Sequence, residues 1–246
     1  MTAKIRFAGL TKVFETDADK PIVALDGIDL EIRQDEFVSI VGPSGCGKST
    51  LLYLLGGFLK ASGGEILVDG KPVRAPGPDR GVVFQHFALF PWKTVLGNVE
   101  YGLAERGLAK AERREIARRY IAMVKLSGFE DTYPNRLSGG MQQRVALART
   151  LACKPEVLLM DEPFGALDAQ TRHVLQEELL EIWQREKKTV LFITHDVREA
   201  VILSDRVIVM TARPGRIKAV INTRNQPAEP LVEHIWKVLR EEISLA

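Results

Sequence analysis

Hydrophobic and polar residues alternate along the first 69 residues of the chain. The alternation is clear in residues 22–32 and 65–68, and Asp-Gly pairs occur at 26/27 and 69/70. A period of two predicts strands with one buried face, and Asp-Gly is typical of tight turns. This part of the chain is therefore predicted to form an antiparallel β flank.

Further along, four short segments are apolar without interruption. They span residues 81–84, 157–160, 190–193 and 207–210, and helical patterns separate them. Continuous apolar runs of this length indicate strands that are buried on both faces, as in a parallel sheet. The chain is thus predicted to be an α/β protein with a mainly parallel sheet.

Between residues 88 and 152 the strand pattern stops. Apolar residues recur at helical spacing in 110–127 and 141–151, so we expect a helical insertion there. Asp168 can cap another helix, and the helical spacing of Leu231, Ile235, Val238 and Leu239 predicts a closing amphipathic helix. The predicted apolar stripe of the helix after Asp168 comprises Val174, Leu175, Leu179, Ile182 and Trp183.

We interpret all 246 residues as a single domain. Residues 1–87 and 153–225 are expected to form the core with its β flank, residues 88–152 the helical subdomain, and residues 226–246 the C-terminal helix. No apolar run approaches the roughly 18 residues of a membrane span. The net charge of only +2 does not favour nucleic acid as a partner.

Residues 42–50 follow the apolar stretch 37–41 and match the phosphate-binding pattern G-x-x-x-x-G-K-[ST]. In that pattern, glycines let backbone N–H groups surround the phosphates, the lysine reaches the β- and γ-phosphates, and a hydroxyl contacts Mg²⁺. A helix that begins near Lys48 would add the positive end of its dipole. A nucleotide is therefore expected at the loop residues Gly42, Pro43, Ser44, Gly45, Cys46, Gly47, Lys48, Ser49 and Thr50.

Two carboxylates, Asp161 and Glu162, follow the predicted strand 157–160. In a phosphate-loop enzyme, the first belongs on Mg²⁺ and the second is placed to polarise the attacking water. A carboxylate pair at a strand end can instead cap the next turn, but open α/β sheets bind their ligands at this edge. We therefore interpret Asp161 as a metal ligand and Glu162 as the catalytic base.

The octet 137–144, Leu-Ser-Gly-Gly-Met-Gln-Gln-Arg, resembles the LSGGQ-like signature of the ABC-type ATPases, with Met141 where that family usually has glutamine. Its glycines allow close approach of the backbone, Ser138 offers a hydroxyl, and a helix that starts near Met141 would direct its positive end at anionic oxygens. The motifs also follow the order of the family: the phosphate loop, Gln85, the octet, Asp161-Glu162, Asp168 and His195.

The resemblance, which extends from about residue 7 to residue 217, implies a role for each motif in the binding of ATP and Mg²⁺. Gln85 would contact Mg²⁺ and the attacking water, His195 the γ-phosphate, and Phe14 the adenine by stacking, although Phe14 can also be a packed strand residue. Two copies would enclose two ATP molecules. The residues implied are, for catalysis, Glu162, His195, Gln85 and Lys48; for the metal, Ser49, Gln85 and Asp161; and for ATP on the other copy, Ser138, Gly139, Gly140 and Asp168.

Residues 86–95 are rich in aromatic side chains, and an exposed aromatic group usually marks a contact. In the ABC family this region receives a short helix of the membrane-embedded subunit. Phe87, Phe90 and Trp92 are therefore expected to contact a transmembrane permease. The alternative is an aromatic minicore of the helical insertion, and both can hold for different side chains.

Residues 77–85 and 210–217 are similar to those of the ATP-binding subunits of nitrate, taurine and alkanesulfonate importers. The resemblance implies a peripheral motor on the cytoplasmic face of the cell membrane, paired with a second copy of itself. Separate permease subunits and, indirectly, a periplasmic or lipid-anchored solute-binding protein are implied as partners. An exporter motor and a soluble ABC ATPase that acts on nucleic acid or ribosomes remain as alternatives.

The two cysteines, Cys46 and Cys153, form no disulfide framework, which fits a reducing cytoplasm. Cys46 precedes a helix start and lies close to Lys48 in sequence, so its thiol is predicted to be the more reactive. Cys153 lies in an apolar stretch and is predicted to be buried.

Overall fold

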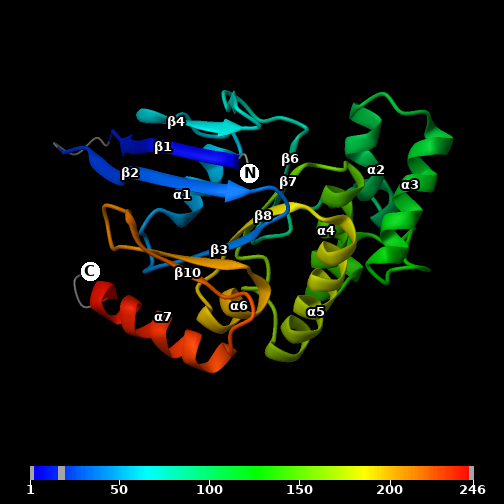
Figure 1. Cartoon of the computed structure of the whole chain (residues 1–246). Helices are drawn as coiled ribbons and strands as arrows, with labels where there is room; N and C mark the ends of the chain where they lie inside the picture. The colour runs from blue at the N-terminus through cyan, green and yellow to red at the C-terminus, as the bar shows by residue number, and fades with distance from the viewer. Residues whose placement is uncertain (1–2, 16–19, 244–246) are drawn as a thin grey trace. The chain divides into compact units, whose positions relative to one another are not determined.

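The computed structural model describes residues 3–15 and 20–243 and divides into two compact units (Figure 1). The first unit contains the residues up to Gly77 and from Lys188 onward, and the second unit is Pro78–Lys187. The last three residues of the predicted C-terminal helix, 244–246, lie outside the described residues.

An antiparallel sheet forms one layer of the first unit. Its strands are β1 (Ala3–Phe14), β2 (Ile22–Arg33), β4 (Gly63–Val68) and β5 (Lys71–Pro72), in the order β2-β1-β4-β5. Alternate residues of β1, such as Ile5 and Phe7, are fully buried. The alternating sequence pattern thus forms the antiparallel flank that it predicts. The turn expected at Asp26-Gly27 is wrong, because both residues lie inside β2, where Gly27 with φ 64° accompanies a shift in the register with β1.

The second layer of the first unit holds the continuous apolar segments. Here β3 (Phe37–Val41) lies between the parallel strands β8 (Thr189–Ile193) and β9 (Arg206–Met210), and β10 (Ile217–Asn222) pairs antiparallel with β9. Every residue of β3 and β8 is buried. The prediction of buried parallel strands is confirmed for this layer.

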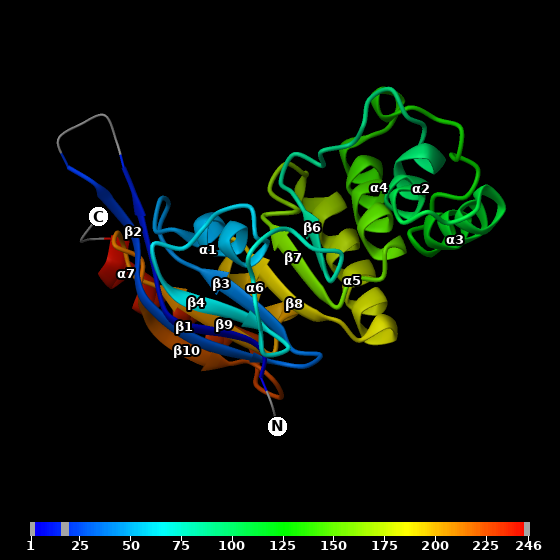
Figure 2. The same ribbon diagram turned by 90° about the horizontal axis from the view of Figure 1, so that it is seen from above.

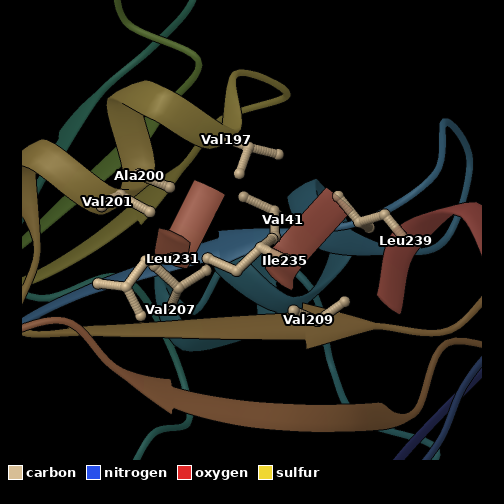
Figure 3. Packing of buried hydrophobic residues seen from close by; sticks show 9 residues of the cluster. All are labelled: Val41, Val197, Ala200, Val201, Val207, Val209, Leu231, Ile235 and Leu239. Carbon is tan, nitrogen blue, oxygen red and sulfur yellow. The ribbon is translucent and has the colours of Figure 1, made fainter. Parts of the chain in front are cut away.

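Three helices complete the first unit: α1 (Lys48–Leu55), α6 (Val197–Leu203) and α7 (Ala228–Ile243). Apolar residues of α6 and α7 meet Val41 of β3 and two valines of β9 in one buried cluster (Figure 3). Figure 1 shows α7 below β10, on the side away from the antiparallel sheet. The predicted amphipathic closing helix therefore buries its apolar face against β9 and α6, with Leu231, Ile235 and Leu239 in the cluster.

The second unit combines two parallel strands, β6 (Arg80–Val83) and β7 (Val157–Asp161), with helices. The helices are α2 (Val95–Glu105), α3 (Lys110–Met123), α4 (Gly139–Ala152) and α5 (Ala169–Glu186), together with the 3₁₀ turn η1 (Pro134–Arg136). Figure 2 shows α4 and α5 beside β7, with α2 and α3 beyond α4. Thr150 of α4 donates a hydrogen bond to the Val82 carbonyl of β6, which fixes this helix on the strands.

Two helix boundaries and the buried face of α5 differ from the sequence pattern. The helix expected over residues 110–127 ends at Met123, because Lys125 has a left-handed backbone with φ 57°. The helix expected near Met141 begins two residues earlier, because Ser138 caps it. On α5, Val174 is 41% exposed and Glu178 is buried in the predicted apolar stripe.

Candidate functional site

The phosphate loop connects β3 to α1 through two glycines that have left-handed backbones. Gly45 has φ 76° and Gly47 has φ 99°, a region that other residues rarely adopt. A Cβ atom at residue 47 would also lie 2.9 Å from the Ala24 carbonyl oxygen, too close for any side chain. Both glycines are therefore required by the backbone path of the loop.

Lys48 is held inside this loop. Its Nζ donates to the carbonyl oxygens of Gly42 and Pro43, at 2.9 and 3.0 Å, and the residue is only 8% exposed. The N-cap residue of α1 is Gly47, which has no side chain to cap the helix, so the helix start can direct backbone N–H groups at an anion. The loop thus combines a fixed positive charge with backbone donors, as phosphate binding requires.

The prediction that Cys153 is buried is wrong, and the structure does not favour the predicted higher reactivity of Cys46. Cys46 is 1% exposed, because its side chain is packed beneath the loop, where Sγ lies 3.9 Å from Lys48 Nζ. Burial raises the pKa of the Cys46 thiol, and the nearby Lys48 charge opposes this rise only in part. Cys153 is half-buried rather than fully buried, and burial also raises its pKa.

His195 follows the strand next to the phosphate loop. Ile40 of β3 pairs with Ile193 of β8 in a parallel register, so His195 and the loop both come after the carboxyl ends of adjacent strands. Phe14 lies at the end of β1 opposite Ile22, half-buried, with Lys12 Nζ 4.8 Å from the centre of its ring. A base could therefore stack only on the other face of Phe14, or after Lys12 moves.

In the second unit, Gln85 and the two carboxylates share one strand edge. Val83 of β6 pairs with Met160 of β7 in parallel, and Gln85, Asp161 and Glu162 follow. A Cβ atom at Gly165 would lie 3.5 Å from Gln85 Nε2 and 3.7 Å from Glu162 Oε2. The side chains of Gln85 and Glu162 thus both reach the turn at Gly165, while Asp161 is 6% exposed.

The octet forms the start of α4. Ser138 Oγ accepts a hydrogen bond from the Met141 N–H at 3.3 Å, which leaves the hydroxyl hydrogen for an acceptor such as a phosphate oxygen. A Cβ atom at Gly140 would lie 2.6 Å from Thr171 Cγ2 of α5. The glycine at 140 therefore also permits close packing of α4 on α5, a second reason that the sequence pattern does not show.

Asp168 lies at the start of α5, close to the start of α4. Its carboxylate accepts from the Thr171 N–H at 2.9 Å, and this hydrogen bond lowers the pKa of Asp168. A Cβ atom at Gly139 would lie 3.3 Å from Cδ2 of Leu167, the residue that precedes Asp168. The structure thus places Asp168 next to the start of the octet helix.

Sequence reasoning missed the residues that orient the octet. Arg144 Nη2 lies 3.0 Å from Oε1 of Glu178, and Gln142 Nε2 donates to the carbonyl oxygens of Pro134 and Leu137. Glu178 is 8% exposed, although it lies on α5 among apolar residues. The sequence signal for this contact is Glu178 itself, a glutamate at a position where the helical period of α5 predicts an apolar residue.

The aromatic segment 86–95 is rigidly held, and its side chains divide between the two interpretations. Asn98, fully buried, accepts from the Phe90 N–H and donates to the carbonyl oxygens of Phe90, Lys93 and Thr94. The ring of Phe90 packs on Tyr101 at 4.6 Å between centroids, whereas Trp92 is 70% exposed. Phe90 belongs to a minicore, and Trp92 is available for a contact.

The side chains expected to bind Mg²⁺ carry suitable donors. Mg²⁺ prefers oxygen ligands, and the candidates offer a hydroxyl (Ser49), an amide oxygen (Gln85) and a carboxylate (Asp161). Ser49 lies in α1 after β3, Gln85 lies two residues after β6, and Asp161 is the last residue of β7, so each is near the carboxyl end of a parallel strand of its own unit. The donor set therefore fits this ion.

None of the helices in the described part of the chain has the length and apolarity needed to cross a bilayer. A sequence model of the family described as ABC transporter matches residues 25–165. An uncharacterized ABC transporter ATP-binding protein of Methanocaldococcus jannaschii is 55% identical, over 99% of this chain and 94% of its own length. A nitrate import ATP-binding protein of Synechocystis is 52% identical, over 89% of this chain and 83% of its own.

The fold has close counterparts among solved structures. A dimeric ATP-binding cassette in a post-hydrolysis state, bound to ADP and phosphate, matches with a TM-score of 0.79 and 35% sequence identity. The match covers 90% of this chain and 100% of that one.

Proposed function

Since this chain belongs to the ABC transporter family of ATP-binding proteins, we propose that it is the ATP-hydrolysing subunit of a membrane importer. The observation that carries the proposal is the presence of two helix starts suited to phosphate. One is α1 behind the glycine loop, and the other is α4 behind Ser138. The similarity to the nitrate import protein favours nitrate as the solute, and the resemblance of residues 77–85 and 210–217 adds taurine and alkanesulfonates as candidates.

Each candidate residue has a distinct task in this proposal. Lys48 and the loop N–H groups bind the β- and γ-phosphates, and His195 contacts the γ-phosphate. Glu162 accepts a proton from the water that attacks the γ-phosphorus, and Gln85 orients that water. Ser49, Gln85 and Asp161 would hold Mg²⁺, which neutralises charge on the phosphate oxygens when it is bound.

We further propose that two copies share each ATP. The phosphate loop of one copy would bind the nucleotide together with Ser138, Gly139, Gly140 and Asp168 of the other. The dimeric cassette with ADP and phosphate supports this arrangement by similarity. ATP favours the closed dimer because only that state offers both sets of contacts, and hydrolysis removes this preference.

The membrane partner is proposed to bind the aromatic segment 86–95. Phe87 and Phe90 are half-buried and shape this surface, and Trp92 projects from it. The protein would then lie on the cytoplasmic face of the membrane as a peripheral subunit. Permease subunits would contact it directly, and a solute-binding protein would act through the permease.

Solute uptake in the native host tests the proposal. Uptake of labelled nitrate, taurine and alkanesulfonate is measured in turn. In cells that carry Lys48→Ala in place of the parent chain, uptake of one of these solutes should be abolished, because the phosphate loop loses its fixed charge. Lys60→Ala, which changes an exposed lysine of the same unit, is the matched control. Unchanged uptake of all these solutes would contradict the importer proposal, and loss of efflux instead would favour an exporter.

A further inference from the structure

Residues 211–216, between β9 and β10, lie against the outer side of the phosphate loop. The guanidinium of Arg213 donates through Nε and Nη2 to the Gly45 carbonyl oxygen, both at 3.3 Å. At Gly215 a Cβ atom would lie 2.1 Å from the Cys46 carbonyl oxygen, so only glycine permits this approach. The sequence pattern predicts a turn here but gives no sign of this contact.

The Gly45 carbonyl belongs to the same peptide as the Cys46 N–H. Because a peptide is planar, fixing its carbonyl oxygen also fixes the direction of its N–H. That N–H donates to the Pro43 carbonyl oxygen at 3.3 Å, and the same oxygen accepts from Lys48 Nζ at 3.0 Å. Arg213 is thus connected, through one peptide plane, to the oxygen that holds the phosphate-binding lysine.

The segment itself is anchored to β2 on one side. The Gly215 N–H donates to the Ala24 carbonyl oxygen at 3.0 Å, and the Asp26 N–H donates to the Gly215 carbonyl oxygen at 3.1 Å. Arg216 forms an ion pair with Asp26. These contacts with β2 fix the position of residues 211–216 relative to the phosphate loop.

The other anchor is the end of α7. Glu242 Oε2 accepts from the Ala212 N–H at 3.0 Å, and Oε1 lies 2.8 Å from Lys218 Nζ. The Glu242 side chain is only 7% exposed, so its charge depends on these partners. The Lys218 ammonium and the Ala212 N–H hold the pKa of Glu242 below its usual range, which keeps this carboxylate charged.

We propose that Arg213 is a positioning residue for ATP binding, and that α7 sets the ATP affinity through the contact of Glu242 with the Arg213 segment. The inference rests on the proposed role of residues 42–50 as the ATP site. Displacing the end of α7 would release Ala212 and Arg213, and the Gly45–Cys46 peptide would lose its fixed orientation. The C-terminal helix is thereby a point at which ATP affinity can be regulated.

The test is the affinity of the full chain for a fluorescent N-methylanthraniloyl ATP, measured by titration, together with KM and kcat for ATP. Arg213→Ala should raise Kd and KM by about fivefold, the net effect of losing one ordinary hydrogen bond of an exposed side chain, and leave kcat within about twofold. Arg213→Lys should recover part of the ATP affinity, because lysine retains the positive charge but not the paired Nε and Nη2 donors of the guanidinium. Arg198→Ala, which breaks an exposed ion pair with Glu229 of α7, is the control and should change neither constant.

Glu242→Gln tests the connection to α7. It should weaken binding in the same direction, and the double variant with Arg213→Ala should bind no more weakly than Arg213→Ala alone, since both act through one path. Equal affinity of Arg213→Ala and the parent would overturn the positioning role, and additive effects would overturn the connection to α7. If Arg213→Ala unfolds at a lower temperature than the parent, the ATP affinity of Arg213→Lys is compared with that of the parent instead. Equal affinity of these two would then overturn the positioning role. A parent chain that binds no nucleotide would refute the proposed function itself.

Discussion

Glu162 adopts a left-handed backbone, with φ 44°, at the end of β7. For a residue with a side chain such a conformation costs about 1–2 kcal/mol relative to an ordinary one, and it persists where the surrounding structure imposes it. The Glu162 carbonyl accepts from the Gly165 N–H at 3.0 Å, which closes a tight turn. This turn directs the carboxylate to the region that Gln85 also reaches, as a shared water would require.

Glu162→Gln is expected to lower ATP hydrolysis by at least about 10²-fold, because the amide cannot accept the proton of the attacking water. ATP binding should persist, and the variant should remain dimeric in Mg-ATP on size-exclusion chromatography. Glu156→Gln, one residue before the start of β7, is the matched control and should hydrolyse ATP normally. A variant with confirmed bound ATP that elutes as a monomer would contradict closure by ATP.

The cysteine thiols give a second prediction at this scale. Cys46 is fully buried and Cys153 is half-buried, so N-ethylmaleimide should label Cys153 first in the folded protein, as mass spectrometry of peptides can measure. Both reactions should be slow at neutral pH, because burial raises both thiol pKa values. Faster labelling of Cys46 would show that the loop opens readily and exposes its thiol.

At the scale of elements, the aromatic segment 86–95 is a preformed loop. Asn98 of α2 binds its backbone, and Arg149 of α4 donates to the carbonyl oxygens of Phe87 and Ala88. Phe87 and Ala88 both have positive φ, of 48° and 47°. A loop fixed from two helices keeps Trp92 exposed without collapse of the segment.

This division predicts different outcomes for two substitutions. Phe90→Ala should destabilise the protein by about 1–3 kcal/mol in urea unfolding, less than for a fully buried phenylalanine, because its half-buried ring packs on Tyr101. Trp92→Ala should change stability by no more than about 0.5 kcal/mol and leave basal ATP hydrolysis intact, yet weaken assembly with the permease. Equal destabilisation by both would mean that Trp92 belongs to the minicore as well.

The apolar pattern predicts the strands of the fold well and the short elements poorly. The continuous runs at residues 157–160, 190–193 and 207–210 lie in β7, β8 and β9, because strands buried on both faces need apolar residues throughout. By contrast, α6 has only seven residues, too few to establish a helical periodicity, and β10 has three consecutive apolar residues, 219–221, so its sequence does not alternate regularly. These two depend on packing against β3 and β9 rather than on a local pattern.

In the candidate site, motifs that are local in sequence could be predicted, whereas contacts between distant residues could not. The phosphate loop and the octet are local in sequence, so their glycines and hydroxyls can be found without a structure. Arg213 lies 168 positions from Gly45, and Glu178 lies 34 positions from Arg144. Contacts of this kind arise only when the chain has folded, and no local pattern encodes them.

At the scale of the whole molecule, the residues expected to act on ATP divide between the two compact units. The phosphate loop and His195 belong to the first, while Gln85, Glu162 and the octet belong to the second. Membership of the ABC transporter family, together with the dimeric cassette bound to ADP and phosphate, supports a dimer with shared sites. We therefore propose that each ATP site is completed by a second copy of the chain.

The most direct test mixes two inactive variants, Lys48→Ala and Ser138→Arg. A mixed dimer contains one site with both defects and one intact site, formed by the phosphate loop of one copy and the octet of the other. With random pairing and independent sites, ATP hydrolysis should return to about a quarter of the parental rate, far above the sum of the separate variants. Differential affinity tags on the two variants would show that mixed dimers form. If these mixed dimers neither bind nor hydrolyse ATP, the shared site is contradicted.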